Sequence, residues 1–213
     1  MRVSPACGSL TCGLADSYVF SGFNLRMRYY TADPHFGHAN IIDLCDRPFA
    51  SLEEMEEAIV EAWARCLCPS DELYILGDLG GPRSTAEHVG ARVESCPGTV
   101  KWVKGNHDKQ SWAKELDRVA EFRGNRVEIR TDRVDPRDDH PVFLVLDHYP
   151  MASWNRAFHG AVQLHGHVHG RFENKDTRRF DVGIDSIGVE PIPEPKIIEA
   201  ALAIDPPKYK RNS

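Results

Sequence analysis

The chain has 213 residues, of which 41% are hydrophobic, and this length and composition suit one domain with a sizeable core. A formal net charge of −6 gives no general attraction to nucleic acid or to an anionic membrane. No apolar run is long enough to cross a bilayer, and the six cysteines lack the paired C-x-x-C spacing of a structural zinc site. We therefore expect a cytoplasmic protein with reduced cysteines and no membrane partner.

The two ends of the chain differ from the segment between them. Residues 1–26 scatter Ser, Gly, Cys and Pro without a sustained period, and Met27 then opens a clear strand pattern. We interpret 1–26 as an N-terminal extension that is either disordered or the result of a translation start assigned upstream of the true start at Met27. The alternative is a first strand around Tyr18–Phe23. We expect one domain over 27–204 and a frayed basic tail over 205–213.

The first half of the domain alternates strand and helix patterns. Capping boxes predict two helix starts, because a Ser side chain can accept a hydrogen bond from the backbone N–H three residues on. In chain order we expect a strand over Met27–Ala32, a short helix over Asn40–Leu44, a helix from Ser51 to Cys66, a strand over Glu72–Leu76, a helix from Ser84 to Cys96, a strand over Thr99–Val103 and a helix over Ser111–Phe122. This order is typical of an α/β sheet with crossover helices.

The second half is richer in strand patterns. We expect strands over Arg126–Thr131, Pro141–Leu146, Val162–Leu164, Arg179–Val182 and Ile197–Ile204, with a helical stretch near Ala152–Ala157. The sequence contains no internal repeat and no low-complexity linker, which favours a single domain.

Groups that bind metals or move protons follow five of these segments. In α/β proteins, functional sites gather where strands end and loops begin, so five such ends predict one shared site with more than one metal. Mixed carboxylate, amide and imidazole ligands favour Mn, Fe or Zn over Mg or Ca. The five ends are Asp33-Pro34-His35, Gly77-Asp78, Gly105-Asn106-His107-Asp108, Asp147-His148 and His165-Gly166-His167-Val168-His169.

The ordered set D-x-H, G-D, G-N-H-D, H, G-H-x-H resembles that of the calcineurin-like metallophosphoesterase superfamily. Residues 33–42, 148–150 and 164–170 resemble its small phage and bacterial predicted phosphoesterase branch. The resemblance covers roughly Met27 to Ile204 and implies a four-layer α/β/β/α sandwich with a two-metal site at the sheet edges. Pro34 departs from the small polar residues common at its position, but it removes no ligand.

The resemblance also implies a ligand set. One divalent ion, most simply Mn²⁺ with Fe or Zn as alternatives, takes Asp33, His35 and His169. The second takes Asn106, His148 and His167, and Asp78 bridges the two. His107 is then the histidine beside the metals, with Asp108 as the partner that orients it.

The implied reaction is hydrolysis of a phosphoester, with a hydroxide held between the ions as nucleophile and His107 as the acid for the leaving group. We expect a phosphodiesterase; a phosphomonoesterase and a non-catalytic metal-binding scaffold on the same fold stay open as alternatives. The substrate is a small molecule or nucleotide, with nucleic acid also open, and the oligomeric state is not indicated. Where the H-x-H-x-D-H motif of metallo-β-lactamase-like enzymes needs Asp-His, this chain has His169-Gly170, which argues against that class.

Two further residues are candidates for substrate contacts, together with Asn106. His38 lies one turn beyond His35 and either faces the phosphate or makes a structural hydrogen bond. Arg156 either pairs with a substrate phosphate or is a solvated arginine.

Overall fold

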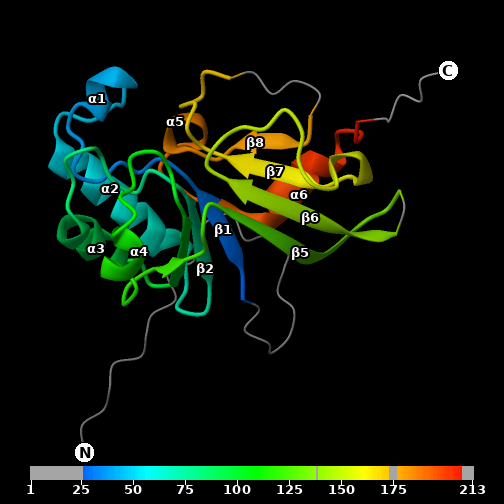
Figure 1. Cartoon of the computed structure of the whole chain (residues 1–213), viewed down its shortest axis with the longest axis horizontal. Helices are drawn as coiled ribbons and strands as arrows, with labels where there is room; N and C mark the ends of the chain where they lie inside the picture. The colour runs from blue at the N-terminus through cyan, green and yellow to red at the C-terminus, as the bar shows by residue number, and fades with distance from the viewer. Residues whose placement is uncertain (1–25, 138, 173–176, 208–213) are drawn as a thin grey trace, which may run out of the picture.

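The chain folds into two sheets with helices packed against them (Figure 1). The structure is a computed structural model that describes residues 26–137, 139–172 and 177–207. The expected extension, apart from Arg26, and the last six residues of the expected tail lie outside these ranges. Within them no helix is long and apolar enough to cross a membrane.

The first sheet has the strand order β4-β3-β2-β1-β9. Strands β1 to β4 run parallel to one another, and β9 pairs antiparallel with β1. Parallel strands end at the same edge of a sheet, so the segments that follow β1, β2 and β3 are neighbours. The strands span Arg28–Thr31 (β1), Glu72–Leu76 (β2), Thr99–Val103 (β3), Glu121–Phe122 (β4) and Ile192–Pro193 (β9).

The second sheet has the order β5-β6-β7-β8. Strands β6, β7 and β8 run parallel, whereas β5 pairs antiparallel with β6 and breaks its register between Arg130 and Val134. The strands span Arg126–Asp135 (β5), His140–Asp147 (β6), Val162–His165 (β7) and Arg179–Asp181 (β8). β5 is longer than expected because it continues beyond Thr131 as the paired arm of a hairpin.

Most of the helices pack on the face of the first sheet that is turned away from the second. The capping box at Ser51 starts α2, since its hydroxyl accepts the Glu54 N–H at 3.2 Å while the Glu54 carboxylate accepts the Ala50 N–H at 2.7 Å. Met55, Ile59 and Trp63 then pack into the core on this face. The helices are α1 (Ile41–Leu44), α2 (Leu52–Cys66), α3 (Ala86–Glu94), α4 (Trp112–Glu115), α5 (Ile184–Ile187) and α6 (Glu194–Leu202), with a 3-10 turn over Ala157–His159.

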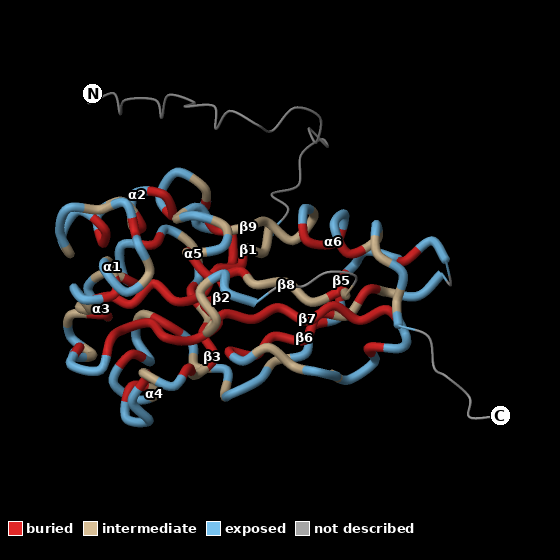
Figure 2. Tube along the Cα trace, turned by 90° about the horizontal axis from the view of Figure 1, so that it is seen from above, coloured by how far each residue is buried: buried red, intermediate tan, exposed pale blue. Residues whose placement is uncertain are grey.

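A second core fills the space between the two sheets. Leu144, Leu146 and Leu164 from the second sheet meet Leu76 and Val103 from the first. Figure 2 shows this buried material running through the middle of the molecule, with exposed chain around it. Among the described residues, one helical layer and two sheets are evident, and the expected fourth layer stays a prediction.

Three expected elements differ in the structure. Ile197–Ile204 was expected as a strand, but Ile197, Ile198 and Ala201 are spaced to share one face of α6, which packs into the core between the sheets. The helix expected over Ser111–Phe122 is limited to α4, because the chain turns after Leu116 and β4 pairs with β3.

The third difference is the stretch near Ala152–Ala157, which is irregular. The left-handed backbone of Arg156, at φ 59°, prevents a continuous helix there. In addition, α3 is capped by Thr85 and not by Ser84, because the Ser84 hydroxyl donates to the Phe36 carbonyl at 2.6 Å.

Candidate metal centre

The ends of the parallel strands from both sheets meet at one place. Ala32, after β1, and Gly183, after β8, form a parallel bridge, and the Ile184 N–H donates to the Ala32 carbonyl at 3.1 Å. This bridge sets the edge of the first sheet against the edge of the second. The five segments predicted from the sequence therefore converge on one site.

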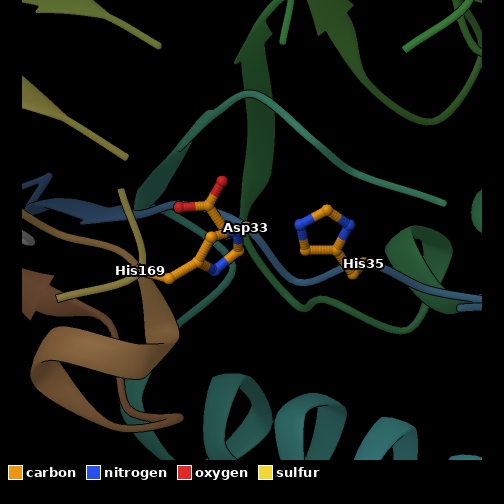
Figure 3. Close-up of side chains that lie close together, drawn as sticks. All are labelled: Asp33, His35 and His169. Carbon is orange, nitrogen blue, oxygen red and sulfur yellow. The ribbon is translucent and has the colours of Figure 1, made fainter. Parts of the chain in front are cut away.

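Asp33, His35 and His169 form one group of potential ligands. One ligand atom from each lies within 4.8 Å of those of the other two. Figure 3 shows the three side chains close together. The rings of His35 and His169 are stacked with centroids 5.3 Å apart. These are the three residues expected to share one ion.

Asp78 lies between this group and a second one. Asp33, Asp78 and His148 also bring their ligand atoms within 4.8 Å of one another. One oxygen of Asp78, Oδ2, lies 3.7 Å from His35 Nε2 and 3.5 Å from His148 Nε2. Asp78 therefore faces both groups, as a bridging carboxylate must, and Asp33 belongs to both.

His148 and Asn106 point their acceptor atoms at the same place. The Leu76 carbonyl lies 2.9 Å from His148 Nδ1, so this nitrogen carries the proton and Nε2 is left with a lone pair. That lone pair faces the Asn106 Oδ1 oxygen at 3.0 Å. Two lone pairs this close repel unless a cation binds both. The His167 ring packs edge-on against His148 with centroids 5.0 Å apart, which adds a second imidazole to this group.

His35 gives an independent test of whether a cation fits. Its imidazole is buried, and neither ring nitrogen has a hydrogen-bond partner among the described residues. An unsatisfied buried polar group costs about 1–3 kcal/mol, and coordination of a metal by one nitrogen would remove part of that cost. The residues present therefore fit a metal ion.

Burial sets the protonation of this site. Burial, reinforced by the nearby Asp78 carboxylate, raises the pKa of Asp33 well above its usual range. Burial and the Arg47 guanidinium lower the pKa of His35 well below its usual value. Asp33 and Asp78 are buried beside one another, and among the described residues no Lys or Arg forms a salt bridge with either carboxylate. A divalent ion stabilises such an arrangement.

The backbone at the site is strained and tightly packed. Five of the seven expected ligands have φ between 49° and 72°, namely Asp33, His35, Asp78, His167 and His169. Such left-handed conformations are uncommon for residues other than glycine and mark functional sites. Glycines allow the close approach: a Cβ at Gly105 would lie 2.2 Å from Asp78 Oδ1, and one at Gly166 would lie 2.4 Å from Asp33 Oδ2.

Asp108 binds backbone groups of the site. Its carboxylate accepts the N–H groups of Asp78 and Gly105 at 2.8 Å and that of Leu79 at 2.9 Å. Burial, against these hydrogen bonds, raises its pKa to about 6. These bonds tie the loop after β2 to the loop after β3. None of the hydrogen bonds described for Asp108 goes to the ring of His107, so the expected orienting role stays a prediction.

Two residues at the site were missed by the sequence analysis. Asp185 accepts a hydrogen bond from His169 Nδ1 at 2.6 Å and pairs with Arg47 through two further bonds of 2.8 Å. Arg47 also donates to the Asp33 carbonyl at 2.8 Å. A carboxylate on Nδ1 fixes the tautomer that leaves Nε2 for a metal. The signal in the sequence was the position of Asp185 just beyond another strand end, β8.

The remaining predicted residues divide between the site and another surface. The half-buried His107 ring lies 5.4 Å from that of His35, and its Nε2 is 4.0 Å from Asp78 Oδ2. The His38 ring lies 5.4 Å from that of His35 and 6.1 Å from that of His107. Arg156, in contrast, places its guanidinium 4.1 Å from the Phe143 ring centroid, on the outer face of the second sheet.

Comparison with known proteins places the chain in a family. It is 30% identical over 175 residues to the uncharacterized protein MJ1445 of Methanocaldococcus jannaschii, with 79% of this chain and 88% of the archaeal protein covered. The chain belongs to the family of this archaeal protein. It is also 24% identical over 183 residues to the gene 66 protein of Mycobacterium phage L5, covering 75% of this chain and 87% of the phage protein. No protein-family model matches.

A solved structure shares the fold. The protein of unknown function AQ665 from Aquifex aeolicus superposes with a TM-score of 0.62 at 22% identity, over 83% of this chain and all of that one. Its likeness concerns the fold alone. The Pseudomonas putida nuclease MPE gives a TM-score of 0.39, which carries no argument about this chain.

Proposed function

We propose that this protein is a phosphoester hydrolase that works with two divalent ions, and that it cleaves phosphodiesters. The observation that carries the proposal is the convergence of the two Asp/His groups on either side of Asp78. Asp33, His35 and His169 would hold one ion, Asn106, His148 and His167 the other, and Asp78 both. A four-layer sandwich belongs to the same proposal.

Two ions held there would supply an activated water and offset negative charge on a phosphate. The residues of the chain have separate tasks. Asp185 and the Leu76 carbonyl keep His169 and His148 in the tautomers that leave Nε2 free. Asp108 fixes the loop that presents Asp78. These contacts hold the ligands in place before any substrate arrives.

His107 is the candidate proton donor. Its side chain is 33% exposed, so the ring could reach a leaving group that departs toward solvent. The backbone N–H of His107 donates to Asp78 Oδ1 at 2.9 Å, which holds the ring near the bridging carboxylate. His107 is not one of the proposed ligands of the metal ions. His38, whose ring lies beside those of both His35 and His107, would touch a phosphate oxygen.

The test is hydrolysis of bis-p-nitrophenyl phosphate beside p-nitrophenyl phosphate, with Mn²⁺, Fe²⁺ or Zn²⁺ added to chelated protein. We expect Mn²⁺ to restore turnover, with the diester preferred. Full activity after exhaustive chelation, with metal verified absent, would contradict the two-metal mechanism. Preference for the monoester would select a phosphomonoesterase. Tight binding of two ions without any turnover on either ester would select the scaffold.

A further inference from the structure

The outer face of the second sheet carries a cavity that the proposed reaction does not use. It encloses about 870 Å³ between β5, β6 and the irregular segment 153–159. Val142, Leu144 and Leu146 of β6 face the core between the sheets, so Phe143 between them faces outward into this cavity. Phe143 lies five residues before His148, roughly 16 Å along an extended strand, which separates the cavity from the metal ligands.

The ionisable side chains that line the cavity are all basic. Arg130, Arg156, His140 and His159 line the cavity, and no Asp or Glu does so among the described residues. Neither Arg130 nor Arg156 forms a salt bridge with any described residue. Glu128, on the neighbouring part of β5, accepts a hydrogen bond from Asn155 at 2.9 Å and is engaged there. In a chain of net charge −6, such a surface is complementary to an anion.

The walls of the cavity are aromatic. Phe143, Trp154 and Phe158 line it, and Phe158 exposes 48% of its surface. Trp154 is fixed because its indole N–H donates to the Ala161 carbonyl at 2.9 Å, which leaves its ring to form part of the wall. Flat rings that line a cavity beside guanidinium groups without a salt bridge are suited to stacking on a planar ring while binding a charged group nearby.

Arg156 is held in a costly conformation. Its backbone has φ 59°, and its carbonyl accepts the N–H groups of His159 at 2.9 Å and Ala161 at 3.1 Å. This places its guanidinium over the Phe143 ring, 4.1 Å from the centroid. Arg130 is the direct cross-strand neighbour of Phe143 and lines the same cavity, so both arginines flank one aromatic residue. Strain of this kind persists where the surroundings require it, and here it completes the cationic lining.

We propose that this cavity binds a nucleotide, with the phosphate on Arg130 and Arg156 and the base against Trp154 and Phe158. A volume of about 870 Å³ lies within the usual range for pockets that take small ligands. The proposal does not depend on the chemistry of the metal centre. It gives Arg156 the phosphate contact that the sequence suggested, but at a different site.

The experiment is calorimetric titration of the full-length, metal-loaded protein with AMP, with adenosine and with inorganic phosphate, repeated after chelation. We expect saturable AMP binding that survives chelation. Adenosine and phosphate should each bind at least tenfold more weakly, because adenosine lacks the phosphate and inorganic phosphate lacks the base. Quenching of Trp154 fluorescence should follow the same curve and be lost in Trp154→Phe.

The variants Arg130→Gln and Arg156→Gln should each raise the Kd for AMP at least tenfold, and Phe158→Ala should weaken AMP but not phosphate. Arg126→Gln is the matched control, since Arg126 is an exposed arginine on the same strand that borders a different cavity. The proposal would be overturned if Arg130→Gln, Arg156→Gln and Phe158→Ala all bound AMP as tightly as the wild type and Arg126→Gln. It would also be overturned by AMP binding that disappears on chelation, or by an oligonucleotide that binds where AMP does not.

Discussion

The two sheets contribute different chemistry to the candidate site. The loops after β1, β2 and β3 of the first sheet supply oxygen ligands, Asp33, Asp78 and Asn106, together with His35. The segments after β6 and β7 of the second sheet supply only imidazoles, those of His148, His167 and His169.

The two sets are also held differently. The carboxylates of the first sheet are fixed by backbone N–H groups, as where Asp33 accepts the His167 N–H at 2.9 Å and Asp78 accepts that of His107. Two imidazoles of the second sheet are fixed through their other ring nitrogen, by the Leu76 carbonyl and by Asp185. The orientation of the carboxylate ligands is thus fixed by the backbone, whereas the orientation of an imidazole ligand can be altered by changing the side chain that binds its other ring nitrogen.

Removal of the carboxylate shared by the two groups should have the largest effect. Asp78→Ala takes away one ligand from both proposed ions and a negative charge between them, so we expect a loss of kcat beyond the 10²–10³-fold that removal of one electrostatic group typically costs. Metal content, measured by mass spectrometry on the same samples, should fall. The control is Asp117→Ala, which removes an exposed carboxylate that follows α4 and is not one of the proposed ligands. Normal metal content and rate in Asp78→Ala would show that Asp78 does not bridge.

The role of His107 can be separated from that of the ligands. As the proton donor, it should matter most for esters whose leaving group is strongly basic. His107→Ala should therefore reduce kcat/KM for alkyl esters toward the 10²–10⁴-fold typical of general acids, and for p-nitrophenyl esters markedly less. Metal content should stay at the wild-type value. Equal losses for both ester classes would exclude the acid role, and a lost ion would make His107 a ligand.

A change of Asp185, the partner of His169, tests directly how the imidazole ligands are held. Asp185→Asn keeps the size of the side chain but removes the charge that Arg47 and the His169 ring both bind. Partners of metal-bound histidines typically contribute 10–100-fold to metal affinity. We expect a loss in that range for one ion, measured by titration with Mn²⁺, while the second ion binds as before.

A second variant, Asp185→Glu, serves as the control for Asp185→Asn because it keeps the charge. In the native protein, contact with His169 and Arg47 outweighs burial and lowers the pKa of Asp185, so the carboxylate is charged when the site assembles. Asp185→Glu restores the charge and should recover part of the affinity. If both variants bound two ions like the wild type, the tautomer of His169 would not be set by Asp185.

The sequence was sufficient to predict which strand ends meet, because each carries a short motif whose residue types are themselves ligands. It could not reveal that Arg47 pairs with Asp185, since the pair joins segments 138 residues apart and neither residue lies in a recognisable motif; only the position of Asp185 after a strand end was a signal. Ile197 and Ile198 illustrate a second limit: β-branched residues favour a strand locally, yet burial of one face against both sheets selects a helix. Asp108 lay inside a predicted motif, but its contacts go to backbone groups that no motif describes.

The smallest effect should come from a chain that begins at Met27, the residue before β1. Among the described residues, deletion of 1–26 removes the ion pair between Arg26 and Glu72, in which the Arg26 side chain is 56% exposed, and exposed pairs contribute about 0–1 kcal/mol. Glu72 keeps Lys101 as a partner. The Met27 N–H donates to Asp71 at 3.0 Å, and a new terminal ammonium at this position would form a stronger, charge-assisted bond to the same buried carboxylate.

We therefore expect the shortened chain to keep its melting temperature within about 3 °C, since 1 kcal/mol corresponds to about 2–4 °C in a domain of this size. It should also retain hydrolysis and both ions. Asp71→Asn in the shortened chain serves as the matched variant: it should lower the melting temperature more than the same change in the full chain, because only the shortened chain places a charged amine there. A drop of several degrees on truncation alone would mean that residues 1–26 pack on the domain and help to hold β1, and with it Asp33, in place.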